Sequence, residues 1–338
     1  MSRTSPTADG PSEQAGSSLT DGYVPLTDAA CRTVAAEFGL GDVLAHEGPT
    51  GRGEAGFVVR LTTTTGSWAV KQLLEADSEA EVQEDVALVA AARAAGVPTP
   101  AMLTTRSGRV LLDVDAQQVR VSEWVDLRDL DPLLDPAAIG TTLAALHRTP
   151  FTGSRGEDEW YRAPVGARRW DELVVGLTAA GAEFADDLAA LRDELVALER
   201  LLVDPHDLRT CHRDLFPENL RGTASGSVCV IDWDNHGLAG ASQELAFVVW
   251  AFAAGRAERA REIVLSYAAD GGPGRLRSPG DFTMLVAALG HINERACRRW
   301  LDHPPSDPER QRMAALFRES VADPLTRRTI EDLVNAVV

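Results

Sequence analysis

The chain has 338 residues, of which 44% are hydrophobic and 25% charged, as expected for a globular protein with room for two lobes. Its 51 acidic residues outnumber its 33 basic residues and give a formal net charge of −18 at pH 7. Nucleic-acid-binding proteins usually display a basic patch, so this balance argues against a nucleic-acid partner.

Residues 1–22 are rich in Ser, Thr, Pro, Gly and Asp and carry almost no apolar side chains, which predicts a disordered tail. They lack the charged and apolar regions of a secretory signal, and no later apolar stretch is long enough to span a membrane. We therefore expect a cytoplasmic protein without a membrane partner. The four cysteines lie far apart without a C-x-x-C spacing, so neither a zinc site nor a disulfide framework is predicted.

The next hundred residues mix helix and strand patterns. In chain order these patterns predict a helix over 27–39, strands at 57–61 and 67–71, a helix over 78–95, and strands near 110–112 and 119–124. Before the first strand, Gly51, Gly53 and Gly56 form a G-x-G-x-x-G pattern. Such a segment lets backbone N–H groups approach phosphates, although the tip of a hairpin has a similar composition.

A lysine in the second strand is a candidate phosphate ligand. Lys71 follows Ala-Val and matches the kinase strand lysine that contacts nucleotide phosphates. The next helix is expected to supply the glutamate that orients Lys71, and both Glu81 and Glu84 are candidates. At the end of the last strand we expect a hinge between two lobes, where the backbone of Glu123 and Val125 could pair with adenine.

Helix dominates after residue 126. Helices are predicted over 135–147, 169–180, 186–202, 242–254, 256–269, 281–302 and 307–321, followed by a short final helix. Within this region the stretch around residues 211–234 carries the clearest chemical signal of the chain.

That signal is an ordered set of polar residues on two consecutive segments. His212-Arg213-Asp214 is followed by Asn219, five residues after Asp214, and by Asp232, thirteen residues after Asn219, at the end of a β-branched run. Phosphoryl transfer requires a carboxylate beside the attacking hydroxyl, with an amide and a second carboxylate to hold magnesium on the nucleotide phosphates. The spacing matches the kinase loop H-R-D-x-x-x-x-N. A structural loop with Asp as turn former and Asn as cap is the alternative, but the complete set favours a phosphoryl-transfer site.

These segments together resemble the aminoglycoside phosphotransferase and choline-kinase-like group of small-molecule kinases, over about residues 25–335. The resemblance rests on the segments 68–71, 96–100, 143–147, 212–219 and 231–234. It implies a two-lobed, protein-kinase-like α+β fold. The small N-terminal lobe, residues 23–125, would contain an antiparallel sheet and one long helix, and the large lobe, residues 126–338, would be mainly helical. It also implies ATP or GTP as phosphate donor, and Mg²⁺.

The resemblance assigns a role to each residue of the motif. Asp214 is the catalytic base and His212 orients its loop, while Asn219 and Asp232 hold magnesium and Lys71 binds phosphate.

The chain departs from the family at two positions. Arg213 stands where these enzymes usually have glycine, and we expect it to add a fixed cation near the catalytic carboxylate. Asp234 replaces a more frequent Glu or Gly. The acceptor site is expected between the catalytic loop and the helices, and its candidate lining residues are Glu159, Trp160, Asp234, Glu294, Trp300 and Asp302.

Protein kinases share the His-Arg-Asp triplet, but two features argue against that class. About sixty mostly helical residues separate His147 from His212, far more than we expect in a protein kinase. After Asp232 there is no Ala-Pro-Glu, and the next helix starts too soon to leave room for an activation segment. We therefore expect a small-molecule kinase.

The acceptor remains open among several hydroxyl compounds. An acidic protein lowers the free energy of a nearby cation, which favours a cationic acceptor such as an aminosugar antibiotic. The competing explanation is that the acidity serves solubility only. A metabolic alcohol such as choline or homoserine is the alternative, as is a relative that binds nucleotide without turnover. The protein is expected to act as a monomer or homodimer with nucleotide and acceptor as its partners.

Overall fold

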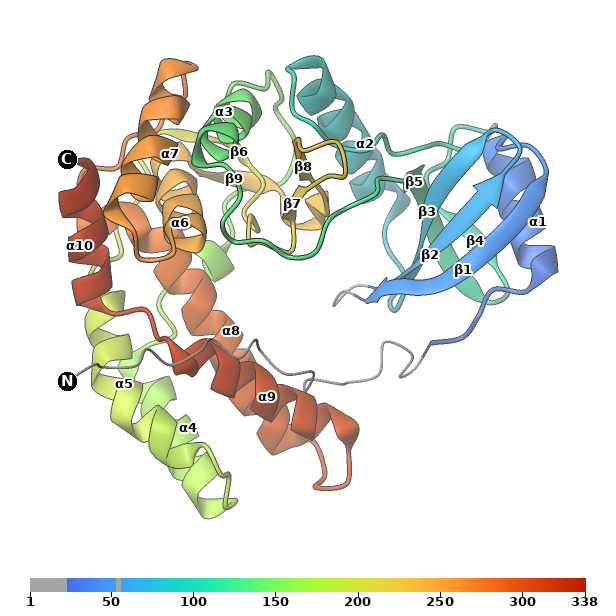
Figure 1. Cartoon of the computed structure of the whole chain (residues 1–338). Coiled ribbons are helices and arrows are strands. Elements are labelled where there is room, and N and C mark those ends of the chain that lie inside the picture. The colour runs from blue at the N-terminus through green and yellow to red at the C-terminus, as the bar shows by residue number, and fades with distance from the viewer. Residues whose placement is uncertain (1–22, 53–55) are drawn as a thin grey trace, which may run out of the picture.

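The computed structural model describes residues 23–52 and 56–338, which form a small lobe built on a sheet and a large helical lobe (Figure 1). The sheet is antiparallel, with the strand order β1-β2-β3-β5-β4. Its strands are β1 (Val43–Arg52), β2 (Gly56–Thr63), β3 (Gly66–Leu73), β4 (Leu112–Val114) and β5 (Gln117–Glu123). Two helices, α1 (Asp28–Phe38) and α2 (Glu79–Ala94), accompany it.

Local sequence signals fix the first helix and its place on the sheet. The Thr27 hydroxyl accepts the backbone N–H of Ala30 at 3.1 Å and caps α1, and Gly39 ends the helix in the left-handed conformation with a φ of +70°. The buried face of α1, which includes Val34, packs against alternate residues of β2, β3 and β5. Both helices of this lobe therefore begin and end within about two residues of their predicted limits.

The glycine-rich segment forms a strand where a loop was predicted. Gly51 lies in β1 opposite Val58 of β2, and Gly53 lies outside the described residues. Gly56 begins β2, where a Cβ atom would lie 2.2 Å from the carbonyl oxygen of Gln72. This glycine is thus required for close pairing of β2 with β3, whatever else the segment does.

Among the described residues, the large lobe consists of eight α-helices and two short antiparallel strand pairs. The helices are α3 (Pro136–His147), α4 (Ala167–Ala179), α5 (Ala185–Glu199), α6 (Ala241–Ala253), α7 (Ala257–Ala269), α8 (Thr283–Asp302), α9 (Pro308–Ala322) and α10 (Arg327–Val337). The strands are β6 (Leu208–Cys211) paired with β9 (Gly237–Gly240), and β7 (Leu220–Gly222) paired with β8 (Val228–Val230). Short 3₁₀ turns are η1 (Glu159–Tyr161), η2 (Trp233–Asn235) and η3 (Pro279–Phe282).

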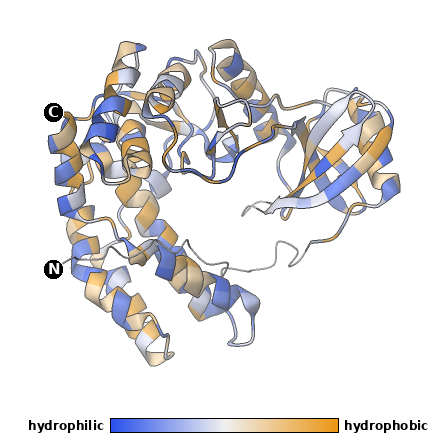
Figure 2. Ribbon diagram, viewed as in Figure 1, coloured by the Kyte–Doolittle hydropathy of each residue, from blue (hydrophilic) through white to orange (hydrophobic). Residues whose placement is uncertain are grey.

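Helix α6 lies at the centre of this lobe. It is buried along most of its length and contacts α3, α7, α8 and the strands β6 and β9, whereas the outer helices alternate apolar and polar faces (Figure 2). None of the helices in the described part of the chain combines the length and the apolar character that a transmembrane span requires.

A short connection after β5 joins the two lobes. Arg128 donates its N–H to the carbonyl of Gly222 at 2.8 Å, and Leu127 bridges to Thr223, so the connection pairs with the β7–β8 hairpin. The indole of Trp233 also donates to the Thr99 hydroxyl at 3.0 Å, which ties the segment after α2 to the large lobe. The predicted α+β, two-lobed fold is confirmed, and the lobe boundary proposed at residues 125 and 126 lies in this connection.

Candidate active site

The loop that carries the His-Arg-Asp triplet follows β6 and is fixed from behind. His212 is fully buried, and its Nε2 lies 3.1 Å from the carbonyl oxygen of Ile231 while its ring packs on Trp233 at 4.9 Å. Arg213 adopts the left-handed conformation with a φ of +68°. His212 thus connects the loop to the segment that leads into Asp232.

Asp214 lies in a half-buried position with two amide donors. Its Oδ2 accepts a hydrogen bond from Asn219 Nδ2 at 2.9 Å and from Asn235 Nδ2 at 3.1 Å. Burial raises the pKa of Asp214 to about 6, because it outweighs the opposing effect of the hydrogen bonds from Asn235 and Asn219. A carboxyl group with this pKa is poised to exchange a proton near neutral pH.

Asn219 presents its amide oxygen away from Asp214. Its Nδ2 also donates to the backbone carbonyl of Asp214 at 2.9 Å, so the amide nitrogen faces the loop. The carbonyl of Asn219 accepts the N–H of Ile231 at 2.9 Å, which places Asn219 next to the segment ending in Asp232. Asp232 itself is 36% exposed at its side chain and adopts a φ of +62°. A carboxylate and an amide oxygen are ligands that suit Mg²⁺.

Two basic side chains from the sheet face two aspartates from the large lobe. Lys71 Nζ lies 2.9 Å from Asp232 Oδ1 and 2.8 Å from Asp234 Oδ2. Arg120, on β5, stands opposite Lys71 in the strand register, contacts the carboxylate of Asp234 closely and reaches Asp232 at 3.9 Å. Burial alone would raise the pKa of Asp234, but Lys71 and Arg120 outweigh it and hold that pKa well below its usual range.

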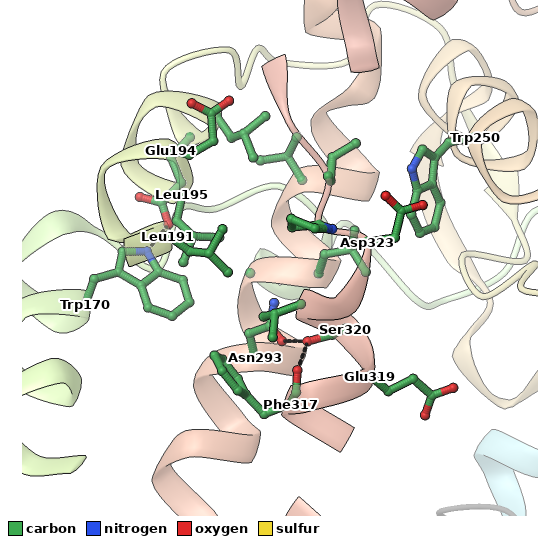
Figure 3. Close-up of a pocket in the computed structure, with 18 residues that line it drawn as sticks. Trp170, Leu191, Glu194, Leu195, Trp250, Asn293, Phe317, Glu319, Ser320 and Asp323 are labelled. Carbon is green, nitrogen blue, oxygen red and sulfur yellow. Dashed lines mark hydrogen bonds between the residues drawn. The ribbon is translucent and has the colours of Figure 1, made fainter. Parts of the chain in front are cut away.

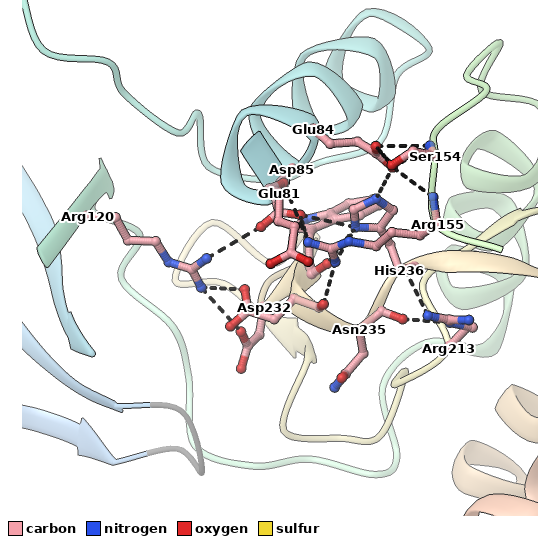
Figure 4. Close-up of polar contacts among 12 residues, drawn as sticks. Glu81, Glu84, Asp85, Arg120, Ser154, Arg155, Arg213, Asp232, Asn235 and His236 are labelled. Carbon is pink, nitrogen blue, oxygen red and sulfur yellow. Dashed lines mark hydrogen bonds and ion pairs between the residues drawn. The ribbon is translucent and has the colours of Figure 1, made fainter. Parts of the chain in front are cut away.

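Neither glutamate predicted to orient Lys71 contacts it, and this expectation is corrected. Glu84 faces the chain after α3, where it accepts the N–H of Ser154 at 2.9 Å. Burial opposes ionisation of Glu84, but the hydrogen bonds from Ser154 outweigh it and lower its pKa to about 2. Glu81 is exposed. The acidic side chain that α2 directs toward the site is Asp85, which is buried beside Arg120 (Figure 4).

The expectation for Arg213 is also corrected, because its guanidinium group binds backbone carbonyls and forms no ion pair with Asp214 among the described residues. It donates to the carbonyl oxygens of Asn235 at 2.6 Å, His236 at 2.9 Å and Gly156 at 3.3 Å, and it lies 4.7 Å from the centroid of the Tyr161 ring. These contacts tie the catalytic loop to the chain that follows Asp232. Arg213 is therefore a structural residue in this arrangement.

A buried polar chain supports the loop from below. Glu244 Oε1 accepts the backbone N–H of Arg213, and Glu244 Oε2 lies 2.7 Å from His147 Nε2, whose Nδ1 lies 2.7 Å from the Tyr267 hydroxyl. Cys211 lies in the same group, and burial raises the pKa of its thiol well above the ordinary value. The hydrogen-bonded pair of His147 and Glu244 thus supports the loop through the backbone N–H of Arg213.

The first two predicted acceptor residues lie near the catalytic loop. Glu159 and Trp160 belong to η1, whose last residue, Tyr161, packs on Arg213. The Trp160 ring stacks on His291 of α8, with 5.2 Å between ring centroids. The segment therefore forms a wall between the catalytic loop and α8.

The other four predicted acceptor residues are engaged elsewhere. Asp234 belongs to the cluster with Lys71. Glu294 pairs with Arg169 at 2.6 Å, and Asp302 pairs at 3.4 Å with an arginine one turn earlier on α8. Trp300 is buried and packs edge-on against an aromatic residue at the start of α5. The six candidates do not converge, because α8 turns its polar groups toward α4 and toward solvent.

A separate cavity of about 150 Å³ lies among α4, α5, α6, α8 and α9 (Figure 3). Trp170, Trp250 and Phe317 form apolar walls, and Glu319 and Asp323 are exposed residues at its edge. No residue of the catalytic loop lines it. The cavity is therefore distinct from the group of residues around Asp214.

Sequence reasoning missed Arg120, Asp85 and Asn235. Arg120 interrupts the apolar run of β5, and Asp85 stands on the buried face of α2 between Val82 and Leu88, so both positions carried a detectable signal. Asn235 carried none, because its role depends on the η2 turn.

An antiparallel sheet that carries Lys71 and Arg120, facing aspartates of a mainly helical lobe, is the arrangement of the kinase-like fold class. The chain belongs to the phosphotransferase enzyme family, whose model matches residues 50–278. No curated protein sequence matches the chain.

Solved structures show the same fold at low sequence identity. An aminoglycoside phosphotransferase from Alicyclobacillus acidocaldarius is 18% identical with a TM-score of 0.63, and 93% of this chain and 96% of that chain are covered. Spectinomycin phosphotransferase in complex with ADP and spectinomycin is 16% identical with a TM-score of 0.64, covering 93% and 99%. A microcompartment-associated aminopropanol kinase is 18% identical with a TM-score of 0.55, covering 89% and 98%.

Proposed function

We propose that this phosphotransferase moves the γ-phosphate of ATP or GTP to a hydroxyl group of a small molecule. The observation that carries the proposal is the meeting of two sets of groups across the lobes. Asp214, held by Asn219 and Asn235, belongs to the large lobe, while Lys71 reaches Asp232 from the sheet at 2.9 Å. Transfer of a phosphoryl group needs both a positioned base and compensation of phosphate charge.

Asp214 is the proposed base. The two amides orient its Oδ2, and burial holds its pKa at about 6, so the carboxylate is ionised at neutral pH yet basic enough to accept a hydroxyl proton. A base placed in this way contributes about 10²–10⁴-fold to the rate. The hydroxyl would approach from the side of η1, where Trp160 and Tyr161 stand beside the loop.

The residues fit a magnesium ion by their donor chemistry. Asn219 would offer its amide oxygen, since its nitrogen is used by Asp214, and Asp232 would offer a carboxylate that is more exposed than that of Asp234. The ion, when bound, neutralises charge on the nucleotide phosphates. Lys71 would then exchange its carboxylate partners for a phosphate oxygen.

The nucleotide would lie against the sheet and the connection between the lobes. The N–H groups of Glu123 and Trp124 already donate to the carbonyls of Ala101 at 2.9 Å and Ser67 at 3.2 Å. An adenine edge would therefore use the carbonyl of Glu123 or the backbone of Val125. Apart from its chain neighbours, no atom of the described residues lies within 4 Å of the place that a Cβ on Gly51 would take, so the backbone of β1 could approach the phosphates there. Gly53 is proposed from its place in the sequence motif alone. Neighbours of the same fold that were crystallised with ADP or AMP-PNP support a nucleotide donor.

We propose a cationic acceptor, with an aminosugar antibiotic as the first candidate. The net charge of −18 supports this choice, as does the place of Glu159 beside the catalytic loop. One structure of similar fold is a spectinomycin phosphotransferase and another an aminopropanol kinase, so both antibiotic and metabolic amino alcohols occur among neighbours. Choline and homoserine remain the alternative acceptors.

The test is an ADP- or GDP-release assay with Mg²⁺ against aminoglycosides, peptide antibiotics, choline, homoserine and neutral sugars. We expect turnover with at least one cationic alcohol and its loss in Asp214→Asn. Turnover confined to neutral or anionic alcohols would contradict the cationic acceptor and leave the kinase assignment intact. Nucleotide binding without turnover of any hydroxyl compound would instead favour a non-catalytic relative.

A further inference from the structure

The polar group that connects α2 to the active site is centred on an arginine. Arg120 projects from β5 on the same side as Lys71, its partner in the strand register, and its side chain is only 8% exposed. Its guanidinium contacts the Asp234 carboxylate on one side and lies 3.6 Å from Asp85 Oδ2 on the other. Asp85 is 3% exposed, so this connection is buried on the α2 side.

A second arginine closes the connection into a ring. Arg155 Nη2 lies 2.8 Å from Asp85 Oδ1, and Arg155 Nη1 donates to the backbone carbonyl of Asp234 at 2.6 Å (Figure 4). Asp234 is therefore held through its side chain by Arg120 and through its backbone by Arg155, and both arginines rest on Asp85. We call Asp85, Arg120, Asp234 and Arg155 the Asp85 ring.

We propose that Arg120 is a positioning residue that holds Asp234 through the Asp85 ring, so that Lys71 is free to bind the nucleotide phosphates and Asp232 is free to hold the metal. The ring then performs the task that was predicted for a direct pair between Lys71 and a glutamate of α2. This inference rests on the proposed use of a nucleotide by the same site.

The charges of the cluster give the reason. In the present arrangement Lys71 divides its ammonium group between Asp232 and Asp234. If Lys71 turned toward phosphate without Arg120, the mostly buried Asp234 carboxylate would lose both of its ion-pair partners in the described part of the chain, which is costly. The planar guanidinium fork can contact Asp85 and Asp234 together, whereas a lysine ammonium is a single point charge.

Asp232 and Asp234 therefore have different roles in this proposal. Asp234 is 25% exposed at its side chain and is contacted closely by Arg120, while Asp232 is 36% exposed and lies 3.9 Å from the same guanidinium. Asp232 is thus the carboxylate that gains least from Arg120 and is most accessible to a metal ion. Asp234 is assigned here as the counter-ion of the sheet arginine and not as an acceptor ligand.

The test compares Arg120→Met with Arg120→Lys and with Arg109→Met as the matched control. Arg109 also pairs with an acidic residue of α2, Glu79 at 3.6 Å, but it is 54% exposed and lies outside the site. Calorimetry would measure the affinity for MgADP, the affinity for adenosine, and the Mg²⁺ concentration needed for ADP binding. Thermal unfolding without ligand would be measured on the same proteins.

We expect Arg120→Met to weaken MgADP binding by about tenfold or more and to raise its Mg²⁺ requirement, because Lys71 stays with Asp234. Adenosine has no phosphate, so Arg120→Met should bind it with the same affinity as the unaltered protein. The control Arg109→Met should equal the unaltered protein in every binding measurement. Arg120→Lys keeps the charge and should fold, yet it should recover only part of the MgADP affinity. A loss that is equal for adenosine and MgADP would show a purely structural role and overturn the proposal.

Asp85→Asn provides the second step. If Asp85 acts through Arg120, its effect on MgADP binding should be much smaller in the Arg120→Met background than in the unaltered chain. Fully additive effects would overturn the ring as a unit. If both Arg120 variants bind MgADP as tightly as the unaltered protein does, the positioning role of Arg120 is wrong, while the proposed function stands. An unaltered protein that binds no nucleotide would overturn the proposed function and this role with it.

Discussion

At the scale of single residues, the environment of Asp214 is a balance between burial and hydrogen bonding. Burial disfavours the charged carboxylate, and two amide donors restore part of the lost stabilisation, with a resulting pKa of about 6. The same residue is therefore expected to limit activity at low pH and to reduce stability at high pH.

The catalytic prediction concerns Asp214→Asn. The substitution should lower kcat by about 10²–10⁴-fold because the hydroxyl proton loses its acceptor. MgADP affinity should change little, since Asp214 contacts neither Lys71 nor Asp232 among the described residues. In the unaltered enzyme kcat/KM should fall below about pH 6, where Asp214 becomes protonated. A near-normal rate in the variant would remove Asp214 from the role of base.

The stability prediction uses the same variant with a different readout. The pKa of Asp214 is raised from 3.8 to about 6 in the folded protein, so the folded state binds this proton more tightly than the unfolded state does. The free energy of unfolding therefore decreases as pH rises between these two values. Asp214→Asn has no titrating carboxyl group at this position, so its stability should not decrease in this way. Its melting temperature should exceed that of the unaltered protein at pH 8, and the difference should shrink toward pH 4. Parallel melting curves across this range would contradict the assigned environment.

The metal ligands give a separate prediction at this scale. Asn219→Ala and Asp232→Ala should each weaken MgADP binding in calorimetry and raise the Mg²⁺ concentration it requires, because each removes one oxygen donor. Binding of adenosine serves as the control and should persist. Two variants that bind MgADP normally would show that the ion is held elsewhere.

At the scale of elements, α3 and α7 pack closely enough to require a glycine. A Cβ atom on Gly140 of α3 would lie 2.4 Å from the carbonyl oxygen of Ile263 and 2.8 Å from the nitrogen of Tyr267, both backbone atoms of α7. Gly140→Ala should therefore destabilise the protein by about 1–3 kcal/mol in denaturant unfolding, despite the helix propensity of alanine.

The matched control is Gly290→Ala on α8, another buried helical glycine. Its Cβ would meet a side-chain atom of Val165 at 3.5 Å, which is an ordinary contact. This variant should unfold at the same denaturant concentration or slightly higher. Equal destabilisation of both variants would mean that backbone contact with α7 is not the cause.

The elements were predicted well where the signal is local. Thr27 and Gly39 bound α1, and Asp135 and Asp307 cap α3 and α9 near the predicted limits, because capping depends on a few neighbouring residues. Strand β1 was missed because its glycines and Pro49 are typical of loops, and only pairing with β2 makes it a strand.

The site was predicted in part, for a similar reason. The motif places Asp214, Asn219 and Asp232 by spacing along one chain segment. The partner of Lys71 lies 161 residues away along the chain, and the partners of the Arg213 side chain lie 22, 23 and 57 residues away. Sequence spacing does not tell how such segments meet. The acceptor residues failed to converge because helix periodicity does not tell which polar face of α8 meets α4.

At the scale of the whole molecule, the excess of acidic residues should be measurable in acceptor binding. Attraction between the protein and a cationic acceptor is screened over about 10 Å at 0.1 M salt. The KM of a cationic acceptor should therefore rise with ionic strength, while that of a neutral acceptor should change little. A salt-independent KM for the cation would indicate that the charge of −18 does not act on the acceptor.

The contacts of Arg213 lie within the large lobe, whereas the ion pairs of Lys71 join the two lobes. Arg213 connects the loop of Asp214 to the chain after Asp232, so the proposed base and the proposed metal ligands belong to the same lobe. Lys71 and Arg120 belong to the sheet of the other lobe. Movement of the sheet away from the large lobe must break the ion pairs of Lys71 with Asp232 and Asp234, which connect the two lobes. If Lys71 binds a nucleotide phosphate as proposed, the nucleotide has to compete with these ion pairs, whereas the connection between the proposed base and the proposed metal ligands lies within one lobe and is not broken.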